Sequence, residues 1–370
     1  MGCERSMLKL YWVVFVLVVV VVASNMNIFG VGGGGGEPLV PCYFIFGDSL
    51  VDSGNNNNLA THAKANYTPF GIDFPHGPTG RFTNGRTTVD FIAEKLGFSH
   101  FIPSFATANG SEILRGVNYA SGSAGIRDET GKQQGDRINL KKQLKHHKIT
   151  ASRIARILGS NESANQHLQK CLYSVEMGSN DYINNYFLPQ FYNTSKLYNP
   201  DQYATVLADQ FSRKLTSLYK HGARKVTVAG LGLIGCTPNA KSLYETKGLC
   251  VEKMNSAASL FNEKLKLLVL KLNSQLKNAT FIFINNRKIA AVSALFPAMK
   301  NIDSSGECCE VGSHGLCKPS STPCKERNAV IFWDSFHPTE IVNKHQAEIT
   351  FSNSDTNVTF PMDIQRLVRL

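Results

Sequence analysis

One stretch, running from Tyr43 to Asn57 with the sequence YFIFGDSLVDSGNNN, constrains the fold more than any other part of the chain. Its first half is a run of aromatic and β-branched residues, which predicts a buried strand. Its second half changes at once to Gly, Asp, Ser and Asn, residues that tolerate tight or left-handed backbone. Ser49 is therefore expected at the carboxyl end of a buried strand, where ligands bind in open α/β sheets. That serine becomes a nucleophile only if a base and an oxyanion site lie nearby.

The first 24 residues differ from the rest of the chain. Arg5 and Lys9 precede a 14-residue apolar run from Leu10 to Ala23, and a small residue, Ser24, follows it. A basic start, a short apolar run and a small-residue exit predict a secretory signal peptide, whereas a membrane span needs about 20 apolar residues. The same segment begins with an acylation-like Met1-Gly2-Cys3, but the apolar run directly behind it favours secretion.

Three regions follow from this reading. Residues 1–24 are the predicted signal peptide, and residues 25–37, which are rich in glycine, form a flexible lead. Residues 38–370 form a single domain, because no linker or internal repeat divides them. We therefore expect no stable membrane anchor once the signal peptide has been removed.

Cysteine usage agrees with secretion. Of the nine cysteines, Cys3 leaves with the signal peptide and eight remain, an even number that suggests disulfides in an oxidising compartment. Eight cysteines allow 105 connectivities, so the pairing stays open, although Cys236 and Cys250 are close enough in sequence to close one loop. The cluster from Cys308 to Cys324 contains His314 and has zinc binding as its alternative, but the vicinal Cys308-Cys309 pair favours disulfides.

Glycosylation and charge give further expectations for a secreted chain. Six Asn-x-Ser/Thr sequons place their segments on the surface. They begin at Asn66, Asn109, Asn161, Asn193, Asn278 and Asn357. The net charge of +11 suits anionic polymers or membranes. Nucleic-acid binding is disfavoured, because the lysines are scattered and no recognition motif stands out.

The order of strands and helices predicts an α/β fold. Besides the strand that begins at Tyr43, strands are expected over 115–120, 171–177, 225–229 and 280–284. Helices are expected over 87–98, 138–158, 203–219 and 251–276, where apolar residues recur at helical spacing. Strands separated by helices imply parallel pairing, so we predict a three-layer α/β/α sandwich around a five-stranded parallel sheet.

Three further motifs stand where such a sheet would gather them. Asp334 lies three residues before His337, so its carboxylate can fix the tautomer of that ring and leave the other nitrogen to take a serine proton. Asn180 follows the third predicted strand and offers an amide donor to an oxyanion. Gly122 follows the second and lacks a Cβ that would obstruct its backbone N–H. Each motif alone is more often an ordinary turn or a structural pair.

In combination, the blocks resemble those of the plant GDSL esterase/lipase family. The matching segments, which extend over about residues 41–349, are Phe46-Gly47-Asp48-Ser49 with Gly54-Asn55-Asn56-Asn57, Asn118-Tyr119-Ala120-Ser121-Gly122, Gly178-Ser179-Asn180-Asp181 and Asp334-Ser335-Phe336-His337-Pro338. The resemblance implies the flavodoxin-like SGNH hydrolase fold. The chain has no Gly-x-Ser-x-Gly motif, which argues against the α/β-hydrolase alternative.

The resemblance also implies a role for each site residue. Ser49 would be the nucleophile, His337 the general base and acid, and Asp334 the residue that orients His337. The oxyanion hole would comprise the N–H groups of Ser49 and Gly122 and the side chain of Asn180. Ser123 follows Gly122 at a position where the family varies, so Gly122 is the less secure of these assignments.

The expected activity is secreted ester hydrolysis through a covalent acyl-enzyme, with a lipid or an acylated cell-wall polymer as substrate and no cofactor. The alternatives are an extracellular acyltransferase that uses the same triad for cutin or polysaccharide acylation, and a catalytically silent protein that binds wall polymers or lipid. Extracellular space, cell wall and vacuole all remain open as destinations. Five phenylalanines could line an acyl pocket, although aromatic residues in loops are more often packing. They are Phe70, Phe74, Phe82, Phe187 and Phe191.

Overall fold

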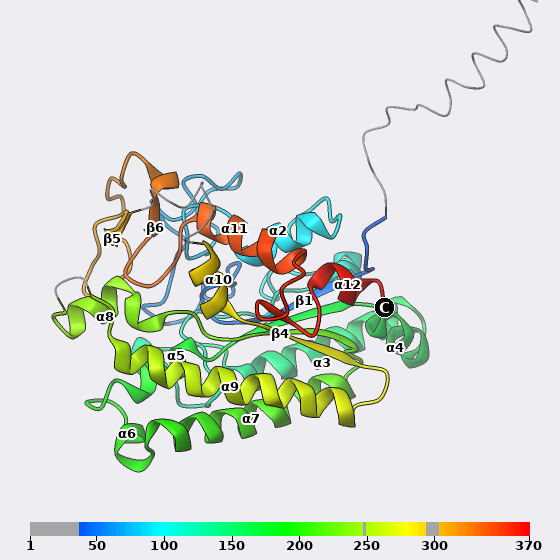
Figure 1. Cartoon of the computed structure of the whole chain (residues 1–370). Coiled ribbons are helices and arrows are strands. Elements are labelled where there is room, and N and C mark those ends of the chain that lie inside the picture. Colours follow the sequence, from blue (N-terminus) through cyan, green and yellow to red (C-terminus); the bar gives the residue numbers. More distant parts are fainter. Residues whose placement is uncertain (1–36, 247–248, 294–302) are drawn as a thin grey trace, which may run out of the picture. The chain divides into compact units, whose positions relative to one another are not determined.

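A five-stranded sheet lies at the centre of the described chain (Figure 1). The computed structural model describes residues 37–246, 249–293 and 303–370, so the predicted signal peptide and nearly all of the glycine-rich lead lie outside the described residues. The strand order is β1-β2-β3-β4-β7; the first four strands are parallel and β7 is antiparallel to β4. The strands are β1 (Tyr43–Gly47), β2 (Leu172–Glu176), β3 (Lys225–Ala229), β4 (Thr280–Ile284) and β7 (Thr359–Phe360). A separate two-stranded sheet pairs β5 (Asp303–Glu307) with β6 (Val330–Phe332).

Helices connect the parallel strands, and the four predicted from periodicity are confirmed as α2, α3, α7 and α9. The α-helices are α2 (Thr88–Lys95), α3 (Leu140–Ile157), α4 (Asn161–Gln169), α5 (Ser179–Asp181), α6 (Thr194–Leu197), α7 (Pro200–Lys220), α8 (Pro238–Leu243), α9 (Glu252–Gln275), α10 (Asn286–Ser293), α11 (Glu340–Phe351) and α12 (Ile364–Val368). Short 3₁₀ or π turns are η1 (Gly110–Arg115), η2 (Lys132–Gln134), η3 (Tyr182–Tyr186), η4 (Ile234–Cys236) and η6 (Arg327–Ala329).

The alternation of side chains along β1 divides the core into two layers. Phe44 and Phe46 point into the cluster formed with α3, α4, α7 and α9, whereas Tyr43 and Ile45 point into the cluster formed with α2, α10, α11 and α12. Figure 1 shows α7 and α9 on one side of the sheet and α2, α11 and α12 on the other. Both faces of the sheet are buried, as parallel strands require. The predicted three-layer α/β/α sandwich is therefore confirmed.

The strand predicted over 115–120 is wrong, although that segment runs beside β1. Its contacts with neighbouring backbone are isolated bridges, from Asn118 to Ile45 and to Ser104. The Asn55 amide donates to the carbonyl oxygens of Asn118 and Ala120, at 2.9 and 2.8 Å. The Asn118 carbonyl also accepts the Phe105 N–H at 2.8 Å, so a side chain and a loop, rather than another strand, bond to this edge of the segment. The fifth strand of the sheet is instead the antiparallel β7.

Four disulfides stabilise the connections, as the even cysteine count suggested. The expected Cys236–Cys250 bridge is present, and the cysteines of the late cluster also form disulfides, so their thiolates are not free for zinc. The pairs are Cys42–Cys171, Cys236–Cys250, Cys308–Cys324 and Cys309–Cys317.

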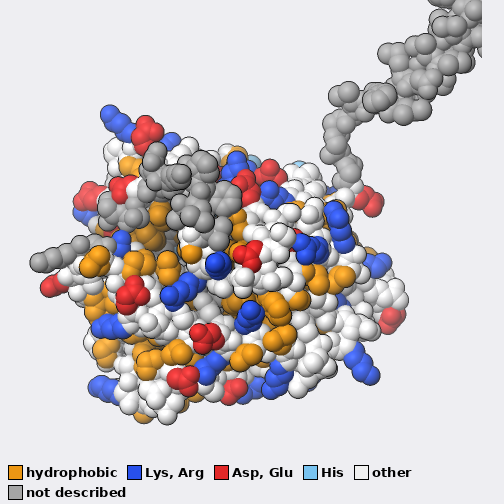
Figure 2. Space-filling view, in the orientation of Figure 1, with side chains coloured by type: hydrophobic (Ala, Val, Ile, Leu, Met, Phe, Trp, Pro, Cys, Tyr) orange, Lys and Arg blue, Asp and Glu red, His pale blue; other side chains and the backbone are white. Residues whose placement is uncertain are grey.

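Three surface expectations can be compared with the structure: the sequons, the basic side chains and the membrane-spanning segments. The asparagines of all six sequons are exposed, which glycan attachment requires, although occupancy itself stays a prediction. On the face seen in Figure 2, lysine and arginine side chains are scattered among acidic and apolar ones rather than gathered in a stripe. No helix within the described ranges is both long and apolar enough to cross a membrane.

A buried ion pair fixes the loop that precedes α2. The Arg81 guanidinium donates two hydrogen bonds to the Asp90 carboxylate, both at 2.8 Å, and each side chain is only 5% exposed. Arg81→Met would leave the Asp90 charge buried and unpaired. We expect the free energy of unfolding, measured by denaturant titration with the disulfides intact, to fall by about 3–5 kcal/mol.

The matched control is Arg86→Met in the same loop. Its Nε atom pairs with Glu340 at 2.7 Å, but the Arg86 side chain is one third exposed. This change should cost about 1 kcal/mol or less. Equal losses for the two variants would contradict the assigned role of burial at Arg81.

Candidate active site

The turn after β1 presents Ser49 at the edge of the sheet. The Asp48 carboxylate accepts the Leu50 N–H at 3.1 Å, which closes a tight turn around Ser49. Gly47 is required at the end of the strand, because a Cβ there would lie 2.4 Å from a Val51 methyl group and 2.8 Å from a β2 carbonyl oxygen. The predicted strand-to-polar transition thus places Ser49 where the sequence indicated.

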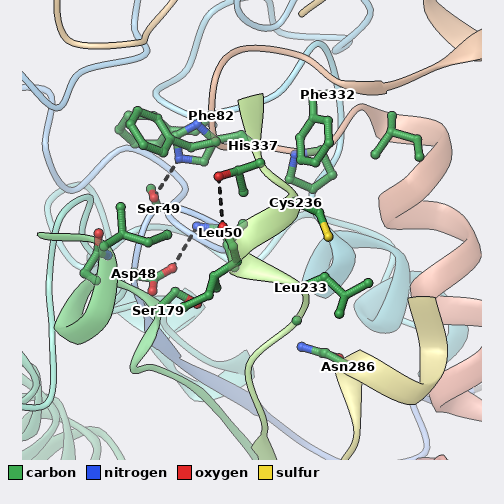
Figure 3. A pocket seen from close by; sticks show the side chains of 18 of the residues that line it. Asp48, Ser49, Leu50, Phe82, Ser179, Leu233, Cys236, Asn286, Phe332 and His337 are labelled. Atoms are coloured by element: carbon green, nitrogen blue, oxygen red, sulfur yellow. Dashed lines mark hydrogen bonds between the residues drawn. The ribbon is translucent and has the colours of Figure 1, made fainter. Parts of the chain in front are cut away.

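Ser49 lies at one end of a hydrogen-bonded series of three side chains, and Figure 3 shows its contact with His337. Its Oγ is 2.7 Å from His337 Nε2, and His337 Nδ1 is 2.8 Å from both carboxylate oxygens of Asp334. Asp334 also accepts the backbone N–H groups of Phe336 and His337 at 2.8 Å. With a proton on Nδ1 held by Asp334, Nε2 accepts the serine hydroxyl hydrogen. The side chains are held in this arrangement by burial, since Asp334 is 0% and His337 4% exposed.

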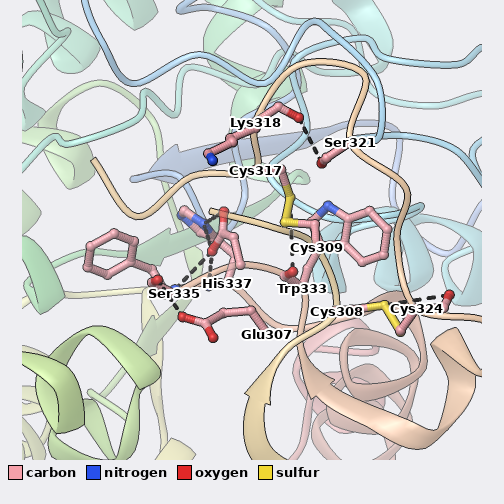
Figure 4. The surroundings of a disulfide bond; sticks show 12 residues. Glu307, Cys308, Cys309, Cys317, Lys318, Ser321, Cys324, Trp333, Ser335 and His337 are labelled. Carbon is pink, nitrogen blue, oxygen red and sulfur yellow. Dashed lines mark hydrogen bonds and ion pairs between the residues drawn. A yellow bond between two sulfur atoms is a disulfide. The ribbon is translucent and has the colours of Figure 1, made fainter. Parts of the chain in front are cut away.

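A tight turn between β6 and α11 carries Asp334 and His337. The Trp333 N–H donates to the His337 carbonyl at 2.7 Å, so the intervening residues form a closed loop. Trp333 is fully buried and anchors that loop. The disulfide-linked segment is bonded to the same turn: the Cys309 N–H donates to the Trp333 carbonyl, and the Ser335 hydroxyl donates to Glu307 at 2.7 Å (Figure 4). The late cysteines therefore stabilise the turn that carries His337 rather than a separate module.

The predicted oxyanion donors do not all face the pocket. Asn180, in α5, lines the pocket. Its Nδ2 donates one hydrogen bond to the Ala124 carbonyl at 3.0 Å, and the second hydrogen of that amide remains available. The expectation for Gly122 needs correction. Its N–H donates to the buried Asp52 carboxylate at 3.0 Å and is therefore not available to an oxyanion. The next residue, Ser123, lines the pocket, and its N–H has no partner among the described residues.

The conformation of Ser123 explains why the sequence indicated the wrong residue. Its φ of 62° is left-handed, a region that glycine occupies more readily than serine. The presence of glycine at 122 was therefore a misleading signal. The buried Asp52, which directs the Gly122 N–H away from the pocket, carries no motif that identifies this role from sequence.

A cavity of about 470 Å³ opens beside Ser49 and is lined mainly by apolar side chains. Only one of the five phenylalanines considered for it, Phe82, lines the wall, and its ring packs on His337 with centroids 5.0 Å apart. Phe70 and Phe74 are buried in packing, and Phe191 is 60% exposed. The wall is built instead by the segment after β3, by β6 and by α10 and α11. Its apolar members there include Leu233, Ile234, Ile289, Ala290, Ile331, Phe332, Phe336 and Val342.

Two acidic side chains also reach this cavity. Burial, together with the nearby charge of Glu176, raises the pKa of Asp48 to about 7. Burial likewise raises the pKa of Glu176, at the end of β2, to about 7. Neither belongs to the series from Ser49 to Asp334. Sequence reasoning missed Glu176 because it forms the end of a strand and stands outside every recognised block.

Within the described residues, one cluster has the spacing of metal ligands: Cys42, His167 and Cys171. Its two cysteines are joined by a disulfide, so they do not offer thiolates. The geometry around Ser49 is thus that of a nucleophile, a base and an acidic partner, with two or more N–H donors beside an apolar cavity. Such an arrangement is suited to acyl transfer.

Comparison with known proteins points the same way. The family description GDSL-like Lipase/Acylhydrolase matches residues 43–350. Among curated relatives from Arabidopsis thaliana, GDSL esterase/lipase At1g29670 is 47% identical over 335 residues, which covers 90% of this chain and 92% of that protein. GDSL esterase/lipase At1g29660 is also 47% identical, over 344 residues covering 90% and 93%, and GDSL esterase/lipase 7 is 43% identical over 343 residues covering 90% and 93%.

The raised pKa of Glu176 leads us to expect that the free energy of unfolding depends on pH. The folded protein binds this proton more tightly than the unfolded chain does, so the stability it contributes is full below the ordinary carboxyl pKa and is lost as pH rises through about 7. Between pH 5 and pH 8, the wild type should lose about 1–2 kcal/mol of unfolding free energy relative to Glu176→Gln.

The measurement is a pair of denaturant titrations, one for each protein, at both pH values with disulfides intact. The Gln variant serves as the reference for titrating groups away from this cavity, and the difference between the two proteins reports the coupled titration of Glu176 and Asp48. Parallel pH dependences, or a wild type that gains stability relative to the variant, would show that Glu176 is not protonated by its burial.

Proposed function

The chain belongs to the GDSL-like lipase/acylhydrolase family, whose compared members are named esterase/lipases, and we propose that it is a secreted serine esterase that uses Ser49, His337 and Asp334 as its catalytic triad. The observation that carries the proposal is the 2.7 Å contact between Ser49 Oγ and His337 Nε2, with Asp334 buried behind the ring. A serine hydroxyl is a weak nucleophile unless such a base takes its proton.

The proposed reaction has two steps. Ser49 Oγ attacks the ester carbonyl carbon while His337 Nε2 takes its proton, and the buried Asp334 carboxylate stabilises the resulting imidazolium. His337 then gives that proton to the departing alcohol as the acyl-enzyme forms. In the second step, water enters, His337 takes its proton, the hydroxide adds to the acyl carbon, and Ser49 leaves with the proton returned.

In both steps the substrate's carbonyl oxygen becomes negatively charged, and hydrogen-bond donors must stabilise it. We propose that Asn180 Nδ2 and the N–H groups of Ser49 and Ser123 supply them, with Ser123 in place of Gly122. Ser49 and Ser123 have backbone N–H groups without hydrogen-bond partners in the part of the chain that the structure describes, and all three residues line the cavity. Asn184 donates to Asn180 Oδ1 at 2.6 Å and so orients the amide.

Two further parts of the proposal, the acyl substrate and secretion, are supported by the cavity and by features of the sequence. An apolar cavity next to Ser49 suits an acyl chain, which favours lipids or acylated cell-wall substrates. Secretion is supported by the predicted signal peptide, by four disulfides and by six exposed sequons.

The direct test is hydrolysis of short and long acyl p-nitrophenyl esters by the secreted, glycosylated protein and by Ser49→Ala. Removal of the nucleophile should lower kcat/KM by at least about 1,000-fold, because the base then has no group to activate. The control is Ser53→Ala, four residues along the same turn; the Ser53 hydroxyl has no partner in the described structure, and its loss should change the rate by less than about threefold.

Equal rates for wild type and Ser49→Ala would refute nucleophilic attack by Ser49. A folded wild type that hydrolyses no ester but transfers an acyl group to an added alcohol in a Ser49-dependent way would replace hydrolysis with acyl transfer.

The oxyanion assignment has its own test in Asn180→Ala. Loss of one preorganised donor should lower kcat by about 100- to 1,000-fold with a much smaller change in KM, because the oxyanion exists only after attack. Stopped-flow or steady-state kinetics on the same p-nitrophenyl esters measures both constants. A change confined to KM would assign Asn180 to substrate binding instead.

A further inference from the structure

Two carboxyl groups that line the cavity, the buried Asp48 and the partly buried Glu176, have no part in the proposed mechanism. Glu176 ends β2 directly opposite Gly47 on the neighbouring strand β1, and Asp48 follows Gly47. Both line the same cavity as Ser49. Figure 3 shows Asp48 close to Ser49, with its hydrogen bond to Leu50 drawn. Burying an acid such as Asp48 beside a mainly apolar cavity is costly unless a hydrogen-bond partner satisfies it.

Each of the two carboxyl groups has one oxygen held and one oxygen uncommitted. Asp48 Oδ1 accepts the Leu50 N–H, whereas its Oδ2 is buried with no hydrogen-bond partner, on a residue that is 1% exposed. Glu176 Oε1 accepts from Asn286 Nδ2 at 3.4 Å, and no partner in the described chain contacts its other oxygen. Asn286 is itself oriented, since its Oδ1 accepts from Gln346 Nε2 at 3.0 Å.

The protonation state of the pair defines what those free oxygens can bind. Because burial raises the pKa of each group to about 7, the two share roughly one proton near neutral pH. Of the two oxygens without a partner, one on Asp48 and one on Glu176, one then carries a proton and can donate a hydrogen bond, and the other can accept one. A hydroxyl group, which both donates and accepts one hydrogen bond, is the complementary ligand.

We infer that Asp48 and Glu176 form a polar subsite that binds a hydroxyl group of the substrate, so that the preferred substrates are hydroxylated esters. The inference rests on the proposed function, since it concerns the same cavity and nucleophile. An ammonium group fits less well, because it would require both neighbouring carboxyl groups to be ionised together. A metal ion fits less well too, because Asn286 Oδ1 is already occupied and two carboxylate oxygens alone make a poor ligand set.

The hydroxyl can belong to either side of the scissile ester bond. On the acyl side it would be a substituent of the fatty chain, and on the alcohol side it would be a second hydroxyl of a polyol such as glycerol. The binding chemistry is the same in both cases. The experiment therefore has two arms that differ only in which side carries the hydroxyl.

The first arm compares p-nitrophenyl hexanoate with the p-nitrophenyl esters of 3-, 4-, 5- and 6-hydroxyhexanoic acid, and the second compares propyl butyrate with glycerol monobutyrate. In at least one of these pairs, wild-type kcat/KM should be at least about tenfold higher for the hydroxylated ester. A site built to hydrogen-bond a hydroxyl discriminates strongly against the analogue that lacks it, because its buried groups are then unpaired.

Variants of Glu176 connect that preference to the subsite. Glu176→Met keeps the length of the side chain but removes both oxygens, and the ratio of kcat/KM, hydroxylated to plain, should fall at least about tenfold. Glu176→Gln keeps one donor and one acceptor in the same place, and the ratio should stay within about threefold of wild type. If Glu176→Met fails to fold by its thermal transition, Asn286→Leu is used instead; it removes the donor that orients Glu176 and should lower the same ratio.

Two outcomes would overturn the subsite. One is a wild type that hydrolyses plain esters as well as every hydroxylated partner, and the other is a preference that persists unchanged in Glu176→Met or, where that variant does not fold, in Asn286→Leu. Both leave ester hydrolysis at Ser49 standing. A wild type that hydrolyses none of the esters would instead refute the proposed function itself.

Discussion

The structure around Ser49 depends on one buried carboxylate, that of Asp52. Its two oxygens accept three backbone N–H groups, from Gly54 and Asn55 at 2.8 Å and from Gly122 at 3.0 Å. Two loops far apart in sequence are thereby bound to a single side chain, and burial raises the Asp52 pKa to about 6. Those three donors stabilise its ionised form, and they account for why an acid is tolerated at 0% exposure.

The opposite wall, which carries His337, is stabilised differently. A small separate core joins the loop that contains Phe70 and Phe82 to the disulfide-linked segment and to Trp333. Two disulfides close short loops in that segment, between residues 308 and 324 and between 309 and 317. The core is too small to order the segment by apolar burial alone, and cross-links reduce the conformational freedom of its unfolded state. His337 is thus positioned by covalent bonds and packing, whereas Ser49 is positioned by hydrogen bonds at a strand end.

Much of this could be predicted from sequence, and the failures have physical causes. The strand at Tyr43 is predictable from its continuous apolar run, and the long helices from apolar residues at helical spacing. The position of Ser49 follows from the polar residues that end that strand. The segment at 115–120 has the composition of a strand, but its outer edge is bonded to the Asn55 side chain and to the loop at Phe105 rather than to another strand. Gly122 fails for a similar reason, because the partner of its N–H, Asp52, is distant in sequence. Long-range side-chain to backbone bonds leave no local pattern.

The absence of a local sequence pattern also explains why the residues that line the cavity are hard to predict, whereas the polar residues beside Ser49 are not. Phe70 was a candidate for the pocket, yet it is fully buried in the core that supports the base, since a loop of this size needs its own aromatic packing. The apolar wall comes instead from segments after β3 and from α10 and α11, which carry no recognisable motif. The groups suited to the reaction thus lie at strand ends and in the turn before α11, whereas most of the apolar wall comes from elements that carry none of them.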